Sequence, residues 1–225
     1  MSSRWGEQPE RVFTVGEVGL DNLLRMKLMS RDEFEESIGR KLNKRNILFT
    51  YHPVTTQEIY EVERDFNQIL LGLEQLHDTL IIFTKANADV GGRLINKMID
   101  EYVEKHSEKA IAFTSLGQLR YLSALQYVDA VVGNSSSGIV EAPSFKVATI
   151  NIGDRQRGRV KAQSTLDIGV DAAELVSALQ TINTSEFQAR LAKVKNPYGQ
   201  GNSSRKIVDI LKKSRCKNVE NKAIL

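Results

Sequence analysis

Small polar residues, a carboxylate and three arginines occur together in one stretch of the chain, residues 131–159. The turn Gly133-Asn-Ser-Ser-Ser-Gly138 precedes a predicted helix that opens near Ser137. Such a turn lets the backbone approach a ligand closely, and the free N–H groups at the start of a helix attract anions. Glu141 lies one turn into this helix, where a carboxylate can accept hydrogen bonds from both hydroxyls of a ribose.

The three arginines follow a predicted strand, Thr149–Ile152, that comes directly after the helix. Arg155, Arg157 and Arg159 alternate along the loop. A guanidinium group can bind phosphate through two parallel hydrogen bonds, a geometry that lysine lacks. The stretch therefore has the outline of a nucleotide site.

A purely structural interpretation of the serine turn is also open. A Ser-rich turn is most often an N-cap, and the helix dipole favours a Glu in the first turn without any ligand. A capping box from Ser137 would place the Glu at position 140, which is Val140. The arginine loop after the adjacent strand favours the ligand site.

Strands and helices alternate along most of the chain, which predicts a Rossmann-like α/β fold: a parallel sheet with helices on both faces. Predicted strands cover Asn46–Tyr51, Leu80–Phe83, Ile111–Phe113, Ala130–Val132, Thr149–Ile152 and Ser164–Val170, and predicted helices cover Thr56–Leu76, Leu94–Tyr102, Leu119–Tyr127, Ala172–Ile182, Phe187–Val194 and Ser203–Lys212. We expect a linker with a first strand (Arg11–Val15) at 1–20, a Rossmann-like nucleotide-binding domain at 21–214 and a polar basic tail at 215–225.

In such a sheet, ligands bind beyond the carboxyl ends of the strands. Five of the predicted strands are followed by polar, glycine-bearing or charged loops. His52 is held before Pro53, which favours an extended backbone and a ring that projects from the sheet edge. The threonines after it fit a capping box, Thr55-x-x-Glu58, and Asn87 and Asp89 are common turn formers.

Length and composition exclude several classes of protein. The 225 residues are 41% hydrophobic, enough for one sizeable α/β domain. The net charge of +3 is small and the charges are mostly interleaved, so nucleic-acid binding is not expected. No apolar run reaches the length of a membrane span, and residues 1–12 have none of the apolar core that is typical of a signal peptide. The single cysteine, Cys216, cannot form an internal disulfide, which favours the cytoplasm.

Metal and cofactor sites are not indicated. His52, His77 and His106 lie far apart with no cysteine near them. The GxGxxG fingerprint of NAD and FAD proteins is absent, and so is a P-loop. We expect no metal and no cofactor.

Four segments together closely resemble the hydrolysing UDP-N-acetylglucosamine 2-epimerases of sialic and nonulosonic acid pathways: HPVTT at His52, FTSLGQLRYLSAL from Phe113, GNSSSGIVEAPSF from Gly133 and TINIGDRQRGR from Thr149. The closing NPYGQGNSSRKIVDIL is also similar to theirs, and the likeness runs from about Pro9 to Lys213. The resemblance implies a two-domain architecture of the glycosyltransferase-B type, with UDP-sugar held between two Rossmann-like domains.

The resemblance also implies roles for individual residues. Ser136, Ser137 and Gly138 would hold the diphosphate, Glu141 the ribose, and Arg155 the phosphate or nucleotide, with Arg159 of the same loop among the UDP-binding residues. The backbone of Thr114, Ser115 and Leu116 would face the uracil, and His52, the expected catalytic residue, would point at the phosphate near the bond that breaks. The family reaction eliminates UDP to give a glycal and then adds water to give N-acetylmannosamine.

The chain departs from the family pattern in length, because nothing in it corresponds to the first domain that supplies the acid/base carboxylates. It matches only the C-terminal half, so we expect it to bind UDP or a UDP-sugar, to pair with an N-terminal domain of the same enzyme, and to be inactive alone. Uncovered apolar surface is also expected to favour self-association to a homo-oligomer. Two alternatives remain open: the donor half of a UDP-sugar glycosyltransferase, and a non-catalytic nucleotide-binding module.

Overall fold

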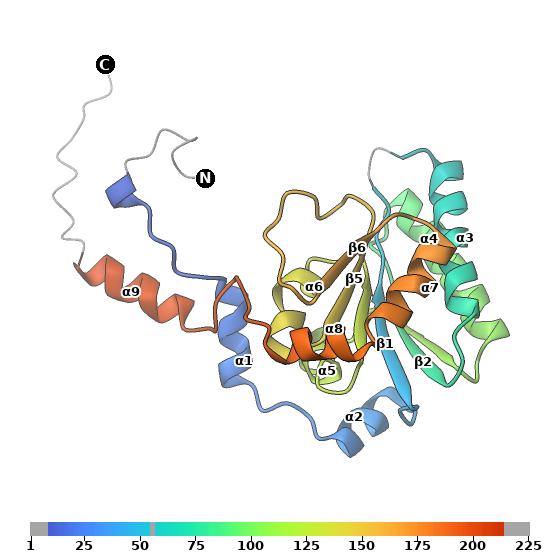
Figure 1. Cartoon of the computed structure of the whole chain (residues 1–225), viewed down its shortest axis with the longest axis horizontal. Coiled ribbons are helices and arrows are strands. Elements are labelled where there is room, and N and C mark those ends of the chain that lie inside the picture. Colours follow the sequence, from blue (N-terminus) through green and yellow to red (C-terminus); the bar gives the residue numbers. More distant parts are fainter. Residues whose placement is uncertain (1–8, 55–56, 214–225) are drawn as a thin grey trace. The chain divides into compact units, whose positions relative to one another are not determined.

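The computed structural model describes residues 9–54 and 57–213, which form two compact units. The larger unit, Lys27–Pro197, contains a six-stranded sheet in which every neighbouring pair of strands is parallel (Figure 1). The strands are β1 (Arg45–Thr50), β2 (Thr79–Thr84), β3 (Ala110–Phe113), β4 (Ala130–Gly133), β5 (Ala148–Ile152) and β6 (Thr165–Ile168). Their order across the sheet is β3-β2-β1-β4-β5-β6, the order of doubly wound nucleotide-binding folds.

Helices connect the strands and cover both faces of the sheet, with α3, α4 and α7 on one side and α5 and α6 on the other (Figure 1). The helices of this unit are α2 (Arg31–Ile38), α3 (Ile59–Glu74), α4 (Val90–Lys105), α5 (Gly117–Ala124), α6 (Ser137–Val140), α7 (Ala172–Thr181) and α8 (Ser185–Ala192), with a 3-10 turn at Ala142–Phe145. This arrangement confirms the predicted α/β class with a parallel sheet.

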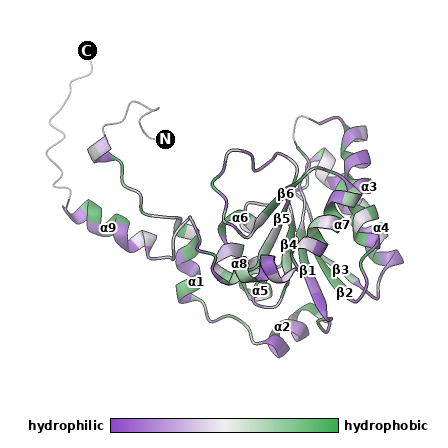
Figure 2. Cartoon of the chain, in the orientation of Figure 1, coloured by the Kyte–Doolittle hydropathy of each residue, from purple (hydrophilic) through white to green (hydrophobic). Residues whose placement is uncertain are grey.

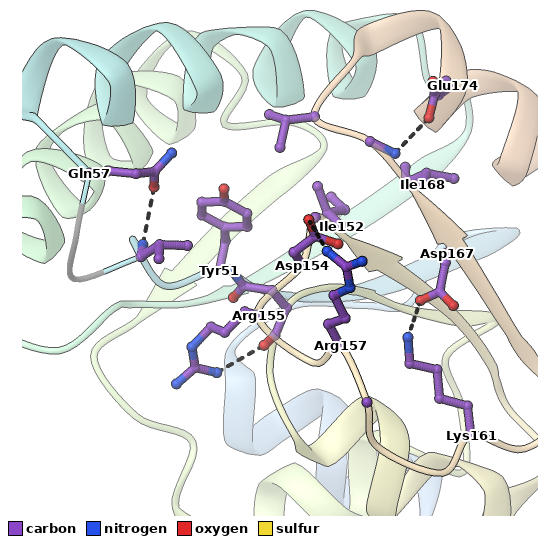
Figure 3. A pocket seen from close by; sticks show the side chains of 16 residues that line it. Tyr51, Gln57, Ile152, Asp154, Arg155, Arg157, Lys161, Asp167, Ile168 and Glu174 are labelled. Carbon is purple, nitrogen blue, oxygen red and sulfur yellow. Dashed lines mark hydrogen bonds and ion pairs between the residues drawn. The ribbon is translucent and has the colours of Figure 1, made fainter.

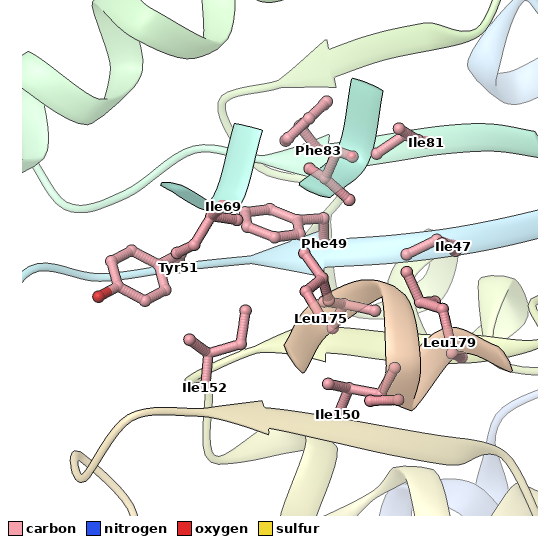
Figure 4. Packing of buried hydrophobic residues seen from close by; sticks show 14 of the residues in the cluster. Ile47, Phe49, Tyr51, Ile69, Ile81, Phe83, Ile150, Ile152, Leu175 and Leu179 are labelled. Carbon is pink, nitrogen blue, oxygen red and sulfur yellow. The ribbon is translucent and has the colours of Figure 1, made fainter. Parts of the chain in front are cut away.

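The strands are apolar on both faces because helices cover both. In β1, the neighbours Leu48 and Phe49 are both fully buried although they point to opposite sides. Phe49 packs against Phe83 of β2, with ring centroids 5.1 Å apart (Figure 4). It also packs against Phe66 of α3, at 6.2 Å. Figure 2 shows hydrophobic residues along the strands and hydrophilic residues on the surface helices. The core therefore fixes the strands whose ends carry the candidate site.

The smaller unit consists of described residues 9–26 and 198–213. It holds 3-10 turns at Pro9–Arg11 and Val18–Leu20 and the helices α1 (Asp21–Arg25) and α9 (Ser203–Lys213). The Asp21 carboxylate accepts hydrogen bonds from the backbone N–H groups of Ser203 and Ser204, each at 2.8 Å, and so caps α9 from a distant part of the chain. The hydrogen bonds from Ser204 hold the pKa of Asp21 below its usual range.

Most predicted elements are confirmed within a few residues, but the strand expected at Arg11–Val15 is wrong. No strand forms at residues 12–16, and Phe13 is 53% exposed. A short apolar run becomes a strand only where a partner supplies backbone hydrogen bonds, and this run has no partner strand among the described residues. The capping box expected at Thr55 falls outside the described residues, and α3 is capped instead by Glu58 with Glu61.

The domain expected to begin at residue 21 differs from the larger compact unit, which begins at Lys27. Asp21 belongs to the smaller unit, where its carboxylate bonds α1 to α9. The tail at 215–225 lies outside the described residues. Within residues 9–54 and 57–213, no helix is both long and apolar enough to span a bilayer.

Candidate functional site

The strand order creates one place where the chain reverses its direction across the sheet. From β1 the chain adds β2 and β3 on one side, and it then returns to place β4 beside β1 and to add β5 and β6 on the other. A crevice forms beyond the carboxyl ends of the two strands at such a switch point, where α/β sheets bind ligands. His52 follows β1 and Asn134 follows β4, so both residues lie at this crevice.

Asn134 binds the backbone of the loop after β1. Its Oδ1 accepts a hydrogen bond from the His52 N–H at 2.8 Å, and its Nδ2 donates to the His52 carbonyl at 2.7 Å. The Asn134 N–H donates to the Thr50 carbonyl at 3.0 Å. Gly133 makes this approach possible, because a Cβ atom there would lie 1.9 Å from the Thr50 carbonyl oxygen.

The carbonyl of the same asparagine binds the loop after β5. It accepts one hydrogen bond from Arg155 Nη1 and one from Gln156 Nε2, each at 2.9 Å. Gln156 is buried, and its Oε1 has no hydrogen-bond partner among the described atoms. Asn134 therefore joins the loops after three strands, β1, β4 and β5, in one network.

Asn134 and Gln156 are not predicted as functional residues from the sequence. An Asn between Gly and Ser is an ordinary turn residue, and its five hydrogen bonds come from partners far away in the chain. Gln156 gives only a weak indication of a special role in the sequence, because it is an uncharged residue between Arg155 and Arg157.

The His52 ring lies partly buried near the Arg155 guanidinium. Burial lowers the pKa of His52, the positive charge of Arg155 lowers this pKa further, and Asp89 opposes the shift. Its Nδ1 is buried without a hydrogen-bond partner among the described atoms. The ring is thus neutral near pH 7.

The serine turn opens a shorter helix than expected. α6 contains one turn, Ser137–Val140, and continues into a 3-10 turn at Ala142–Phe145. Ser136 occupies the N-cap position but makes no side-chain cap bond, whereas the Ser135 hydroxyl accepts from the Ser137 N–H at 3.4 Å. The capping interpretation thus applies only weakly to Ser135.

Gly138 has a packing role that the sequence analysis did not foresee. A Cβ atom at this position would lie 2.8 Å from Thr149 Cγ2 on β5, and Thr149 Oγ1 donates to the Gly138 carbonyl at 2.6 Å. Close contact between α6 and the sheet therefore requires this glycine, independently of any ligand.

Glu141 lies in a cluster of polar groups between α5 and α6. The Tyr121 hydroxyl lies beside the Ser137 hydroxyl and near the Glu141 carboxylate. Burial, opposed by the Ser137 hydroxyl and aided by the Glu141 charge, raises the pKa of Tyr121. Tyr121 therefore stays protonated and adds a hydroxyl to the expected ribose site.

The loop after β3 forms a separate group that Arg120 holds in place. Thr114 and Ser115 are exposed and Leu116 is buried. Arg120 donates to the Leu116 carbonyl at 2.9 Å and to the Ser115 carbonyl at 3.3 Å, and it also lies over the Phe113 ring. These bonds hold the turn in one conformation. The turn lies apart from the switch point, because β2 separates β3 from β1.

A cleft of about 730 Å³ lies at the β5–β6 side of the site (Figure 3). Asn134 and Arg155 line it, whereas His52, Ser136 and Glu141 are not among its lining residues. The exposed Arg159 is not among them either, and its backbone N–H donates to the Gln156 carbonyl at 3.3 Å. The structure thus links His52 to Arg155 through Asn134, and it places Glu141 with Ser137 in a second cluster.

Metal binding finds no support in the part of the chain that the structure describes, where no group of three or more histidine, cysteine or acidic side chains is arranged to hold an ion.

Solved structures define the class of fold. The fold of this chain is similar to that of the UDP-GlcNAc 2-epimerase of Methanocaldococcus jannaschii, solved in complex with UDP-GlcNAc and UDP. The TM-score is 0.70 and the sequence identity 21%, and the similarity covers 94% of this chain and 57% of that chain. The parallel sheet and its helices correspond to a Rossmann-like domain of glycosyltransferase-B-type enzymes.

The sequence places the chain within one family of that class. The family profile described as UDP-N-acetylglucosamine 2-epimerase matches residues 3–212, and the chain belongs to this family. It is 38% identical over 183 residues to the GDP/UDP-N,N'-diacetylbacillosamine 2-epimerase (hydrolyzing) of Campylobacter jejuni, with 81% of this chain and 47% of that protein covered. It is 32% identical over 210 residues to the UDP-N,N'-diacetylbacillosamine 2-epimerase (hydrolyzing) of Legionella pneumophila, with 93% and 53% covered. The chain thus spans about half the length of these relatives.

Proposed function

We propose that this chain is the UDP-binding part of a hydrolysing UDP-N-acetylglucosamine 2-epimerase. The observation that carries the proposal is the network around Asn134, which fixes His52 and Arg155 at the switch point of the sheet. A cation and a neutral imidazole beside backbone N–H groups at the start of a helix suit a diphosphate.

Each part of UDP has a proposed partner. The backbone N–H groups of Ser136, Ser137 and Gly138 bind the diphosphate, with Arg155 neutralising its charge. Glu141 accepts hydrogen bonds from the ribose hydroxyls. The packing role of Gly138 does not conflict with this assignment, because Thr149 occupies the Cα side of the residue and its carbonyl rather than its N–H.

Two further contacts complete the proposal. The backbone of Thr114, Ser115 and Leu116 faces the uracil, whose edge needs both a hydrogen-bond donor and an acceptor. Arg159 adds a second positive charge to the phosphate region and is the more peripheral of the two arginines, because Arg155 is the one bonded to Asn134.

The proposed reaction is elimination of UDP from a UDP-sugar followed by addition of water. A base removes the C2 proton while the C1–O bond to UDP breaks, and water then adds at C1 as C2 is reprotonated from the opposite face. His52 stabilises the leaving phosphate. The proposed sugar is N-acetylglucosamine, and the relatives named as diacetylbacillosamine 2-epimerases support a sugar with two N-acetyl groups as the alternative.

We expect little or no turnover by the isolated chain. Glu141 is assigned to the ribose, so no carboxylate among the proposed contacts remains for the C2 proton. The proposed partner is an N-terminal domain like the one that completes the longer relatives, and self-association and a cytoplasmic location remain predictions.

Calorimetric titration with UDP, UMP and ADP tests the proposal. UDP should bind more tightly than UMP, because the second phosphate contacts Arg155, and ADP should bind most weakly, because the uracil contacts are lost. Equal affinity for UDP and ADP would favour the non-catalytic nucleotide-binding module instead, and absence of UDP binding would refute both.

Variants of two residues sharpen this test. Arg155→Ala should weaken UDP binding about tenfold or more, as expected for a charged hydrogen bond. Arg157→Ala is the matched control, because Arg157 lies in the same loop, is exposed and contacts Asp154 only at 3.9 Å. Glu141→Gln should weaken UDP binding but leave the binding of 2′,3′-dideoxy-UDP, which lacks both ribose hydroxyls, nearly unchanged.

A further inference from the structure

The backbone carbonyl of Asn134 is shared by two neighbouring side chains of the loop after β5. Arg155 Nη1 and Gln156 Nε2 each donate to it at 2.9 Å. A carbonyl oxygen has two lone pairs, so these two hydrogen bonds fill its capacity as an acceptor. No lone pair of this oxygen is left for a second N–H group of the guanidinium.

The two side chains differ in what they can reach. Arg155 is exposed and lines the cleft (Figure 3), and its bond to Asn134 is the only hydrogen bond of its guanidinium to the described residues. A guanidinium has five N–H donors, so most of those of Arg155 are left for a ligand. Gln156 is 3% exposed and is not among the lining residues. Of the two, only Arg155 can therefore contact a ligand in the cleft.

The Gln156 amide limits how Arg155 binds the carbonyl. A guanidinium presents its N–H groups as a planar fork, which favours binding through two nitrogens at once. With a free lone pair on the Asn134 oxygen, a second nitrogen of Arg155 would turn toward it, and fewer donors would point at a phosphate. Gln156 Nε2 occupies that lone pair and holds Arg155 to one bond.

The Gln156 side chain makes no other hydrogen bond among the described residues. Its Oε1 is buried without a partner there, so its hydrogen bonding depends on Nε2 alone. The Gln156 carbonyl accepts from the Arg159 N–H at 3.3 Å, a bond that a side-chain substitution leaves intact. An apolar side chain of similar length removes one hydrogen bond together with one unpaired oxygen, and it should therefore change stability little.

We propose that Gln156 is a positioning residue for Arg155, which keeps the guanidinium donors directed at the second phosphate of UDP. The inference rests on the proposed function, because Arg155 must bind that phosphate. Gln156 acts through the shared Asn134 carbonyl and does not touch the nucleotide.

Gln156→Met tests this role, because it removes the Nε2 donor and nearly keeps the length of the side chain. Calorimetry on the 225-residue chain compares UDP with UMP, which lacks the second phosphate. The affinity for UDP should fall about fivefold, less than the tenfold step expected of Arg155→Ala, and the affinity for UMP should stay within about twofold.

Gln188→Met is the matched control for this substitution. Gln188 of α8 also donates from Nε2 to a backbone carbonyl, that of Ile182 at 2.7 Å, and it lies outside the cleft. Its replacement should leave the affinities for UDP and UMP unchanged.

A double-mutant cycle separates positioning from a general structural effect. In an Arg155→Ala background, Gln156→Met should cause no further loss of UDP affinity, because the residue through which it acts is gone. A purely structural contribution would lower the affinity in both backgrounds.

NMR of the unmodified chain covers the case in which Gln156→Met fails to fold. Addition of UDP should shift the side-chain N–H signals of Arg155 much more than the Nε2 signals of Gln156, which stay bonded to the Asn134 carbonyl. Shifts of Gln156 as large as those of Arg155 would make it a ligand contact and refute the positioning role.

The outcomes keep the two proposals apart. If UDP does not bind to the unmodified chain, the proposed function and this inference are both refuted. If UDP binds but Gln156→Met retains the full UDP affinity, weakens UMP equally, or acts also without Arg155, only the role of Gln156 is refuted.

Discussion

The side-chain amide of Asn134 satisfies both backbone groups of His52, accepting from its N–H at 2.8 Å and donating to its carbonyl at 2.7 Å. One buried residue after β4 thereby determines the position of the ring that follows β1. A second asparagine, Asn96 of α4, binds Ala86 after β2 in the same way, at 2.8 and 3.1 Å. The two pairs differ in location, because only the first lies at the switch point.

We predict that Asn134→Ala both destabilises the protein and weakens UDP binding. The substitution leaves a buried donor and acceptor of His52 unsatisfied, at a cost of about 1–3 kcal/mol in the free energy of unfolding. Asn96→Ala should lower stability by a similar order and leave UDP affinity unchanged. Urea unfolding and calorimetry measure the two effects, and equal UDP affinity of both variants would contradict the assigned role of Asn134.

Gly138 and Thr149 allow the packing role of the glycine to be separated from a ligand role. Gly138→Ala should destabilise by about 1–3 kcal/mol, because the new Cβ meets Thr149 Cγ2. Thr149→Ser removes that methyl and keeps the hydroxyl that donates to the Gly138 carbonyl. The double variant should therefore regain most of the stability lost by Gly138→Ala in urea unfolding.

The UDP affinity of the same double variant checks the proposed diphosphate contact. It should equal that of the unmodified chain, since the alanine retains the N–H group. An unfolding midpoint no higher than that of Gly138→Ala would show that the Thr149 contact does not explain the glycine.

The His52 ring should titrate below its ordinary pKa of 6.5 in the free chain, because burial and Arg155 both disfavour its charged form. Bound UDP should raise this pKa, because the phosphates stabilise the imidazolium. Since folding lowers the pKa of His52, the neutral ring contributes to the free energy of unfolding above pH 6.5. This contribution is lost as pH falls through the pKa of the folded state.

NMR titration of the ring protons measures the His52 pKa, and His52→Gln identifies the signal. A value at or above 6.5 in the free chain would contradict the predicted environment.

Glu35, in the first helix of the larger unit, should stabilise the protein in a pH-dependent way. Hydrogen bonds from Lys41 and Arg31, with one from the Leu42 N–H, lower the pKa of its carboxyl from 4.5 to about 2. A depressed pKa stabilises the fold above pH 4.5, and this contribution is lost as pH falls toward about 2. Glu35→Gln should therefore destabilise the protein at neutral pH but not near pH 2, as measured by urea unfolding. An equal difference at both pH values would contradict this.

The sequence by itself determined the alternation of elements and which loops lie at the carboxyl edge of the sheet. Apolar runs such as the one ending at Tyr51, separated by helical periodicity, predict parallel strands covered on both faces. His52 and the GNSSSG turn could therefore be placed at one edge before any coordinates were known. The same local reasoning was wrong for Arg11–Val15, since strand formation depends on a partner that composition does not reveal.

The tertiary structure alone decided which residues meet. The strand order put β4 beside β1, so that Asn134, an ordinary turn residue in the sequence, came within hydrogen-bonding distance of a loop 82 residues away. It also set Gly138 against Thr149 and opened the cleft beside Arg155. These contacts join residues far apart in the chain, and local propensity carries no information about such pairs, because they depend on how the strands are ordered and packed.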